Sequence, residues 1–324
     1  MSDLNTKLSE ASATVFLARL IKCSSNNDII WFCKTYLASL MEFIDKIYSK
    51  VADLFNFFDV EHMLYYFSVA PAMLLLELLI VGWERSSIRK ITKFNKSVRT
   101  DVVFFLLDAF NVYNLLTVIV SFGVFHVLAR LVFEVTDFNL IATITNPYIQ
   151  FGVLFVMSDF KNYFSHWLFH KNMSLWSLHE LHHSATDFCM LTRHRGHFLE
   201  TAMKRMLDVI PFAILGSVET YIAVKVLSEA HQLVLHSSIK SNWGFLGRYL
   251  LVSPNAHRLH HSINKQHYGK NFGSTFIVWD KIFGTYYEPV AINELGTEGH
   301  LYNREGTIRD VVRGLRNFFT NLRG

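Results

Sequence analysis

Long apolar stretches alternate with polar segments along this chain. Residues 63–83 are almost uncharged apart from Glu77, and they are numerous enough for one helix across a bilayer core of about 30 Å. Further apolar stretches cover residues 102–135 and 148–160. We therefore predict an all-α, integral membrane helical bundle with two more crossings after the first.

A dense basic segment follows the first apolar stretch and predicts the orientation of the chain. It contains Arg85, Arg89, Lys90, Lys93, Lys96 and Arg99. Positive charge next to the end of a membrane span marks the cytoplasmic side. Two crossings after this segment bring the chain back to the cytoplasm before residue 166.

The two ends of the chain differ from its centre. In residues 1–60 the apolar positions are interrupted by charges, which favours interfacial or peripheral helices. Residues 308–322 combine apolar and arginine positions, as is typical of a basic amphipathic helix on a membrane surface. We expect three parts: N-terminal helices at 1–60, a membrane-embedded domain at 61–290 and a cytoplasmic basic tail at 291–324.

Composition agrees with a membrane protein. Hydrophobic residues make up 51% of the 324 residues, charged residues only 18%, and the mean hydropathy is +0.23. The net charge of +4 is modest and its basic residues gather near the expected membrane ends, which argues against nucleic-acid binding. Residues 1–10 lack the pattern of a cleavable signal peptide. Three cysteines without metal-binding or disulfide spacing indicate a reducing compartment.

Eight histidines fall into three tight sets, which predict a metal site. The sets are His166 and His170; His179, His182 and His183; and His257, His260 and His261. Residues three or four apart share one face of a helix. Eight imidazoles exceed the four ligands of a structural zinc ion, but they suit two metals about 3.5 to 4 Å apart. Iron fits oxygen activation, and zinc also binds imidazole readily.

A common metal centre constrains the apolar segment 206–227, which lies between the second and third histidine sets. A single crossing there would place those sets on opposite faces of the membrane. We therefore predict a re-entrant hairpin or two short helices around Gly216, so that the chain returns to the same face.

Several motifs around the histidines resemble those of the fatty acid hydroxylase and sterol desaturase superfamily, whose members are membrane-bound, histidine-rich di-iron oxygenases. The N-terminal motifs are Asp159-Phe160, Tyr163, Leu175-Trp176-x-x-His179 and Thr192-x-x-Arg195-x-His197-x-x-Glu200. The C-terminal motifs are Ser253-Pro254, His257-Arg258-x-His260-His261-Ser262, His267, Lys270-Asn271-Phe272-Gly273 and Trp279-Asp280-x-x-Phe283-Gly284-Thr285. This half is most similar to bacterial members and to the related alkylglycerol monooxygenases. The resemblance implies that 61–290 is the catalytic domain and that it binds two iron ions and uses O2.

The resemblance also implies further site residues. His236 matches a family ligand position, whereas Gln232 stands where some members have histidine and His231 is displaced by one residue, about 100° around a helix. Possible additional ligands, or partners that orient the ligands, are His231, His197, His267, Asp159, Asp280 and Asn271. Glu180, Asp187 and Glu200 are further acids that can orient imidazoles.

We expect an enzyme that hydroxylates or desaturates a lipid with O2, its substrate being a fatty acyl chain, sterol, carotenoid or ether lipid from the bilayer. The chain has no Gly-x-Gly-x-x-Gly loop and no cysteine cluster, so a separate ferredoxin, cytochrome or reductase, or a pterin, must supply electrons. Two alternatives remain. One is a zinc-dependent lipid hydrolase with Glu180 or Glu200 as its base, and the other is a non-enzymatic membrane metal-binding protein.

Overall fold

The computed structural model describes residues 65–113, 115–116, 144, 146–215, 218–292, 294–299 and 301–323. Within these ranges the chain is helical, with two isolated antiparallel bridges, Leu251 to Phe276 and Ser262 to Leu295, in place of any sheet. The predicted all-α fold is confirmed for this part of the chain. The helices expected in residues 1–60 and most of the apolar stretch 102–135 lie outside the described residues.

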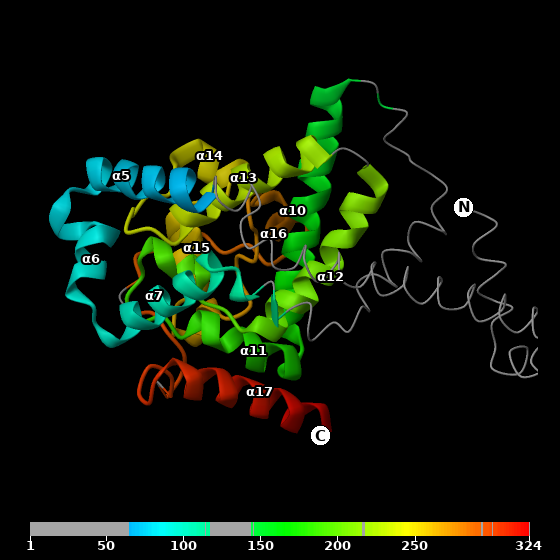
Figure 1. Ribbon diagram of the computed structural model, residues 1–324. Coiled ribbons are helices and arrows are strands. Elements are labelled where there is room, and N and C mark those ends of the chain that lie inside the picture. The colour runs from blue at the N-terminus through cyan, green and yellow to red at the C-terminus, as the bar shows by residue number, and fades with distance from the viewer. Residues whose placement is uncertain are drawn as a thin grey trace, which may run out of the picture. The chain divides into compact units, whose positions relative to one another are not determined.

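The described elements follow one another in this order. They are η1 Tyr65–Val69, α5 Ala70–Val81, η2 Trp83–Arg85, α6 Ser87–Lys93, α7 Lys96–Ala109, α10 Pro147–Lys171, α11 Met173–His183, η3 Met190–His194, α12 Phe198–Leu215, α13 Val218–Leu235, α14 Gly244–Tyr249, α15 Pro254–His260, η4 Lys265–His267, α16 Val278–Ile282 and α17 Thr307–Arg323. Figure 1 shows their arrangement.

The first apolar stretch does not form the single long helix that we predicted over 63–83. A π-turn, η1, precedes α5, and α5 ends at Gly82, whose φ of 74° breaks the helix. Glu77 on α5 is fully buried, and its carboxylate accepts hydrogen bonds from Ser87 N (2.7 Å), Ser87 Oγ (2.8 Å) and Ser238 N (2.6 Å). Among the described helices, none is both long and apolar enough to cross a bilayer.

A tight turn joins the two helices that carry the first two histidine sets. Asn146 caps the start of α10 with Pro147 in its first turn, as expected for a helix N-terminus. Asn172 then ends α10 and caps α11, where its side chain accepts a hydrogen bond from Leu175 N (3.1 Å). α10 and α11 are thereby brought into contact.

The predicted change of helix near Gly216 is confirmed. α12 ends at Leu215 and α13 begins at Val218, and both helices contact α10. Each has 18 residues, so the pair extends further on both sides than the apolar stretch 206–227 suggested. α13 leads back to α15, and His236, which directly follows α13, lies beside His182 of the second set.

The helix predicted at 308–322 is present as α17, and it runs along α11 (Figure 1). Phe318 packs against Phe169 and Leu178, and Gly314 lies next to the carbonyl of Ser177. The opposite face of α17 leaves Ile308, Val312, Phe319 and Leu322 exposed. That this helix lies on a membrane surface remains a prediction.

Candidate metal centre

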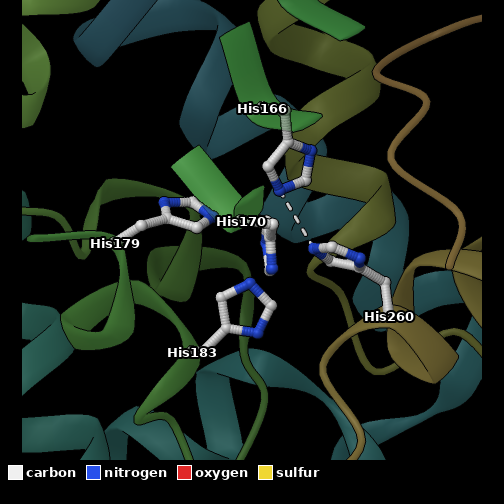
Figure 2. A group of neighbouring side chains, drawn as sticks. All are labelled: His166, His170, His179, His183 and His260. Atoms are coloured by element: carbon white, nitrogen blue, oxygen red, sulfur yellow. Dashed lines mark hydrogen bonds between the residues drawn. The ribbon is translucent and has the colours of Figure 1, made fainter. Parts of the chain in front are cut away.

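The structure brings all nine histidines predicted as metal ligands into two groups. Group A consists of His166, His170, His179, His183 and His260, and group B consists of His182, His236, His257 and His261. Within each group, one ring nitrogen from every residue lies within 4.8 Å of all the others. The five rings of group A converge on one space between α10, α11 and α15 (Figure 2).

Neighbouring histidines are divided between the two groups. His182 and His183 are adjacent on α11 and therefore point about 100° apart around the helix axis. His183 joins group A and His182 joins group B, while His260 and His261 divide in the same way. The rings of His183 and His261 stack with their centroids 4.1 Å apart, so the two groups lie directly beside each other.

Two rings of group A face each other in a way that a metal cation would satisfy. His166 Nδ1 donates to the carbonyl of Phe272 (2.9 Å) and His260 Nδ1 donates to that of Lys270 (2.8 Å). A neutral imidazole carries one proton, so both Nε2 atoms present lone pairs, and they lie 2.9 Å apart. Two ligands at 90° around a metal with bonds of about 2.1 Å stand roughly 3.0 Å apart. The spacing therefore fits neighbouring ligands on one metal ion.

Group B repeats this arrangement. His182 Nδ1 donates to the carbonyl of Arg195 (2.8 Å), and His236 Nδ1 donates to that of Gln232 (2.8 Å). Their Nε2 atoms lie 3.3 Å apart, and His257 Nε2 lies 3.0 Å from His236 Nε2. A second cation fits between these nitrogens.

Buried nitrogens without a partner support the same conclusion for group A. His170 Nε2, His179 Nε2 and His183 Nε2 are buried and make no hydrogen bond to the described part of the chain. A buried polar atom left unpaired costs free energy, about 1 to 3 kcal/mol each. The all-imidazole donor set suits iron or zinc, so the residues present fit two such metal ions.

The protonation states also suit metal binding. Burial holds the pKa values of His182 and His183 well below their usual range, so both rings stay neutral. Burial also lowers the pKa of His179, although Glu200 opposes this effect. Metals bind the neutral ring, so these shifts favour ligation near neutral pH.

Glu200 is the carboxylate that contacts a histidine of group A. Its Oε1 accepts from His179 Nδ1 (2.7 Å) and from Lys204 Nζ (2.6 Å). Burial alone would raise the pKa of the Glu200 carboxyl, but His179 and Lys204 hold it well below its usual range. An ionised carboxylate on the far nitrogen fixes the tautomer of His179 and makes its Nε2 a stronger donor to a metal.

Asp159, Asp280 and Asn271, predicted as possible ligands or partners, brace the loop over group A. Asp280 accepts from the backbone amides of Phe272 and Gly273 (2.8 Å each), and burial raises its pKa to about 6. Asp159 accepts from Thr275 N (2.7 Å), Phe276 N (3.0 Å) and Trp279 Nε1 (2.9 Å). Asn271, with φ of 55°, exchanges two hydrogen bonds with the backbone of Tyr287. The loop carbonyls that orient His166 and His260 are held in this way.

The three other candidate histidines belong to neither group. His231 lies against Trp243, with ring centroids 5.4 Å apart, while His267 contacts Tyr287. His197 Nε2 donates to the carbonyl of Val311 on α17 (3.1 Å).

The other two acids predicted to orient imidazoles have different partners. Glu180 accepts a hydrogen bond from the hydroxyl of Tyr302 (3.1 Å). Asp187 pairs with Lys90 (3.0 Å).

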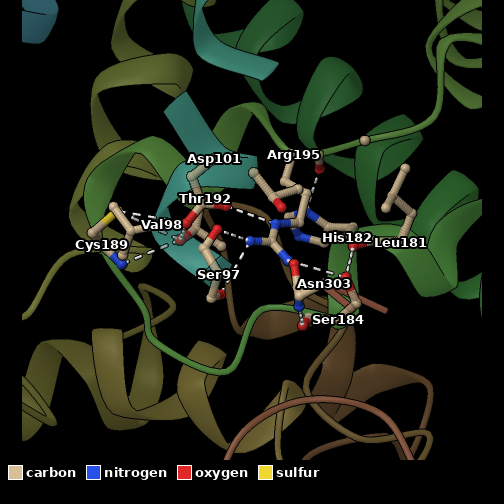
Figure 3. A network of polar contacts seen from close by, with 12 residues as sticks. Ser97, Val98, Asp101, Leu181, His182, Ser184, Cys189, Thr192, Arg195 and Asn303 are labelled. Atoms are coloured by element: carbon tan, nitrogen blue, oxygen red, sulfur yellow. Dashed lines mark hydrogen bonds and ion pairs between the residues drawn. The ribbon is translucent and has the colours of Figure 1, made fainter. Parts of the chain in front are cut away.

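The buried network around Arg195 was not predicted from the sequence (Figure 3). The Arg195 side chain is 1% exposed and its Nε donates to Asp101 Oδ1 (2.6 Å). Its Nη1 donates to Ser184 Oγ (3.0 Å) and Asn303 Oδ1 (3.2 Å), and its Nη2 to the carbonyl of Ser97 (2.5 Å). Because the Arg195 carbonyl accepts from His182, this network positions group B. In the sequence, only the position of Asp101 as a single acid at the edge of an apolar stretch pointed to a buried role for it.

Comparison with known proteins agrees with this geometry. Residues 151–285, which contain all nine histidines, match the family model described as fatty acid hydroxylase. The match covers 135 of the 324 residues, and over this segment the chain is similar to that family. The resemblance predicted from the sequence is confirmed by this match.

The curated proteins that are similar to this segment are named as lipid-modifying enzymes. An ornithine lipid hydroxylase from Rhizobium tropici is 30% identical over 41% of this chain and 40% of its own length. An alkylglycerol monooxygenase from Caenorhabditis elegans is 32% identical over 44% of this chain and 27% of its own. A Delta(7)-sterol 5(6)-desaturase from Gibberella zeae is 27% identical over 44% of this chain and 39% of its own.

The chain thus spans at most about two fifths of the length of these relatives. No solved structure matches it.

Proposed function

We propose that this protein is a membrane-bound oxygenase that hydroxylates or desaturates a lipid at a pair of iron ions. The observation that carries the proposal is the pairing of groups A and B, in which nine imidazoles, all buried except the half-buried His166 and His170, converge on two adjacent spaces. When bound, the two irons supply the oxidation of an unactivated C–H bond by O2. The relatives, which include lipid hydroxylases and a desaturase, support the reaction class.

The chain's own residues hold and shield this centre. Acceptors on Nδ1 fix the rings of His166, His179, His182, His236 and His260. Most of these side chains are buried, which keeps bulk water away from the reacting atoms. No protein nucleophile is needed, since the metal pair carries the redox chemistry.

The membrane location, the orientation of the site and the partners belong to the same proposal. The basic segment 85–99 predicts that the histidines face the cytoplasm, and the lipid then enters from the bilayer. Because the sequence has no nucleotide loop or cysteine cluster, a separate electron donor or a pterin supplies the electrons. Domain 61–290 is the catalytic part, between the N-terminal helices at 1–60 and the C-terminal segment 291–324.

The described geometry does not favour zinc-dependent hydrolysis. That reaction needs a general base free to activate a water molecule. Glu200 is committed to His179 and Lys204, and Glu180 accepts a hydrogen bond from Tyr302. Each carboxylate that we considered as a base thus already has a structural partner.

Metal analysis of protein purified without oxygen tests the proposal. We expect two irons per chain in the wild type, and fewer than two in His260→Ala and in His236→Ala, because each variant removes a ligand from one group. His267→Ala is the matched control, since His267 belongs to neither group, and it should keep both irons. The iron-loaded wild type should consume O2 as it oxidises lipid. Zinc without iron, together with lipid cleavage that needs no O2, would overturn the assignment.

A further inference from the structure

A cavity of about 720 Å³ opens behind group B. It lies between the end of α5, η2, α6 and the segments at residues 186–188, 238–241, 292 and 294–295. Phe188 lines it and separates it from the histidines, because its ring stacks on His236 (5.4 Å between centroids) and meets the edge of His261 (4.8 Å). The cavity is therefore one aromatic ring away from the candidate metal centre.

Arg258 enters this cavity as a buried cation without a carboxylate partner in the described part of the chain. The residue is 7% exposed, and its guanidinium lies 5.0 Å from the centre of the Phe188 ring. Nη2 donates to the carbonyl of Ser237 (2.8 Å), but Nε has no hydrogen-bond partner among the described residues. Burying an unpaired charge is expensive, and arginine prefers a planar oxyanion that it can bind with two nitrogens. Arg258 thus presents an unfilled site for an anion.

The other charges around the cavity leave an excess of positive charge. Lys90 is neutralised by Asp187 (3.0 Å), and Glu84 lies 3.8 Å from Arg89. Among the lining residues, four cations, Arg85, Lys90, Lys240 and Arg258, stand against three acids, Glu84, Asp187 and Glu294. This balance favours an anionic ligand.

An apolar surface adjoins the positive cavity. Ile80 lines the cavity and is 57% exposed, and one turn earlier on α5 Leu76 is 47% exposed, while Leu79 is 82% exposed. A free inorganic anion gains nothing from contact with these apolar side chains, whereas an acyl chain that packs on them removes apolar surface from water. Together, the cations and the apolar side chains match an amphiphile.

We propose that this cavity binds the oxyanion of a lipid head group, a phosphate or carboxylate, with Arg258 as its buried anchor and Arg85 and Lys240 at its rim. The bound lipid is the substrate, a statement that rests on the proposed function; the binding of the oxyanion does not depend on it. If the head group is anchored here, its distance from the metal ions determines which carbon of the acyl chain lies next to them.

Calorimetric titration of the metal-loaded protein in a non-ionic detergent tests this. The probes are dihexanoyl phosphatidic acid, the neutral dihexanoylglycerol and inorganic phosphate. Phosphatidic acid should bind most tightly, and Arg258→Gln should weaken it about tenfold to a hundredfold, because a charged hydrogen bond contributes roughly 1.5 to 3 kcal/mol. Arg316→Gln, which changes an exposed arginine on α17, should leave binding unchanged.

A second variant covers the event that Arg258→Gln loses metal or does not fold. Arg85→Gln combined with Lys240→Gln alters only exposed side chains and should weaken phosphatidic acid binding several-fold with full metal content. Equal binding of the neutral glyceride would overturn the oxyanion site. Inorganic phosphate that binds as tightly as the lipid would overturn the lipid assignment. Binding that persists in a protein without oxygenase activity would refute the proposed function and leave the head-group site standing.

Discussion

Single residues decide which histidine belongs to which metal position. His182 and His183 are neighbours in the sequence, yet the carbonyl of Arg195 holds the first in group B, while the second stacks on His261 from within group A. Spacing predicted that eight of these rings converge, and the family resemblance added His236. It could not predict their division, because the division depends on main-chain carbonyls that leave no trace in the sequence.

Glu200 should tune the metal affinity of group A. Glu200→Gln keeps the size of the side chain but removes the charge that makes His179 a better donor. Loss of such a partner typically lowers metal affinity about 10- to 100-fold. A competition titration with a chelator measures this.

Glu180→Gln is the matched control, since Glu180 is on α11 but accepts its hydrogen bond from Tyr302. The metal affinity of Glu180→Gln should equal that of the wild type. Equal affinities for Glu200→Gln and wild type would show that the carboxylate has no influence on the metal.

At the scale of elements, an irregular loop is as important to the centre as the helices. Residues 270–276 supply the carbonyls that accept from His166 and His260, and Asp159 and Asp280 hold this loop by its amides. The sequence marked both aspartates as candidates because they match the family motifs. It could not show that they act on the backbone, because an aspartate that accepts from backbone amides and one that accepts from an imidazole look identical in a sequence.

Gly273→Ala should displace this loop. A Cβ at residue 273 would lie 2.8 Å from the carbonyl oxygen of Phe276, 2.9 Å from Asp280 Oδ2 and 2.7 Å from Val252 Cγ2. Overpacking of this kind typically costs 1 to 3 kcal/mol. Because the loop orients His166 and His260, we expect a lower melting temperature together with weaker metal binding.

Gly152→Ala provides the comparison for that measurement. Gly152 lies within α10 and a Cβ there meets nothing within 4 Å, so alanine should stabilise the helix slightly. If both variants melt alike and retain metal equally, the loop does not set the geometry of group A.

At the scale of the whole described molecule, the centre depends on parts outside the matched segment 151–285. Asp101 on α7 and Asn303 before α17 complete the shell of Arg195, and the carbonyl of Val311 holds His197. Hydropathy placed residue 101 only at the start of an expected membrane stretch. The pairing with Arg195, 94 residues away, is a tertiary contact that no local pattern reveals.

Asp101→Ala should therefore disturb group B, although Asp101 contacts none of its histidines. The change leaves the Arg195 guanidinium buried without its counter-charge, which typically costs about 3 to 5 kcal/mol. The backbone of Arg195 then shifts away from His182, so we expect a lower melting temperature and loss of metal. Adding Arg195→Met removes the unpaired guanidinium charge but keeps the backbone carbonyl of residue 195. This double variant should recover much of the melting temperature and of the metal content. If it is as impaired as Asp101→Ala, the damage comes from Asp101 itself and not from the unpaired arginine.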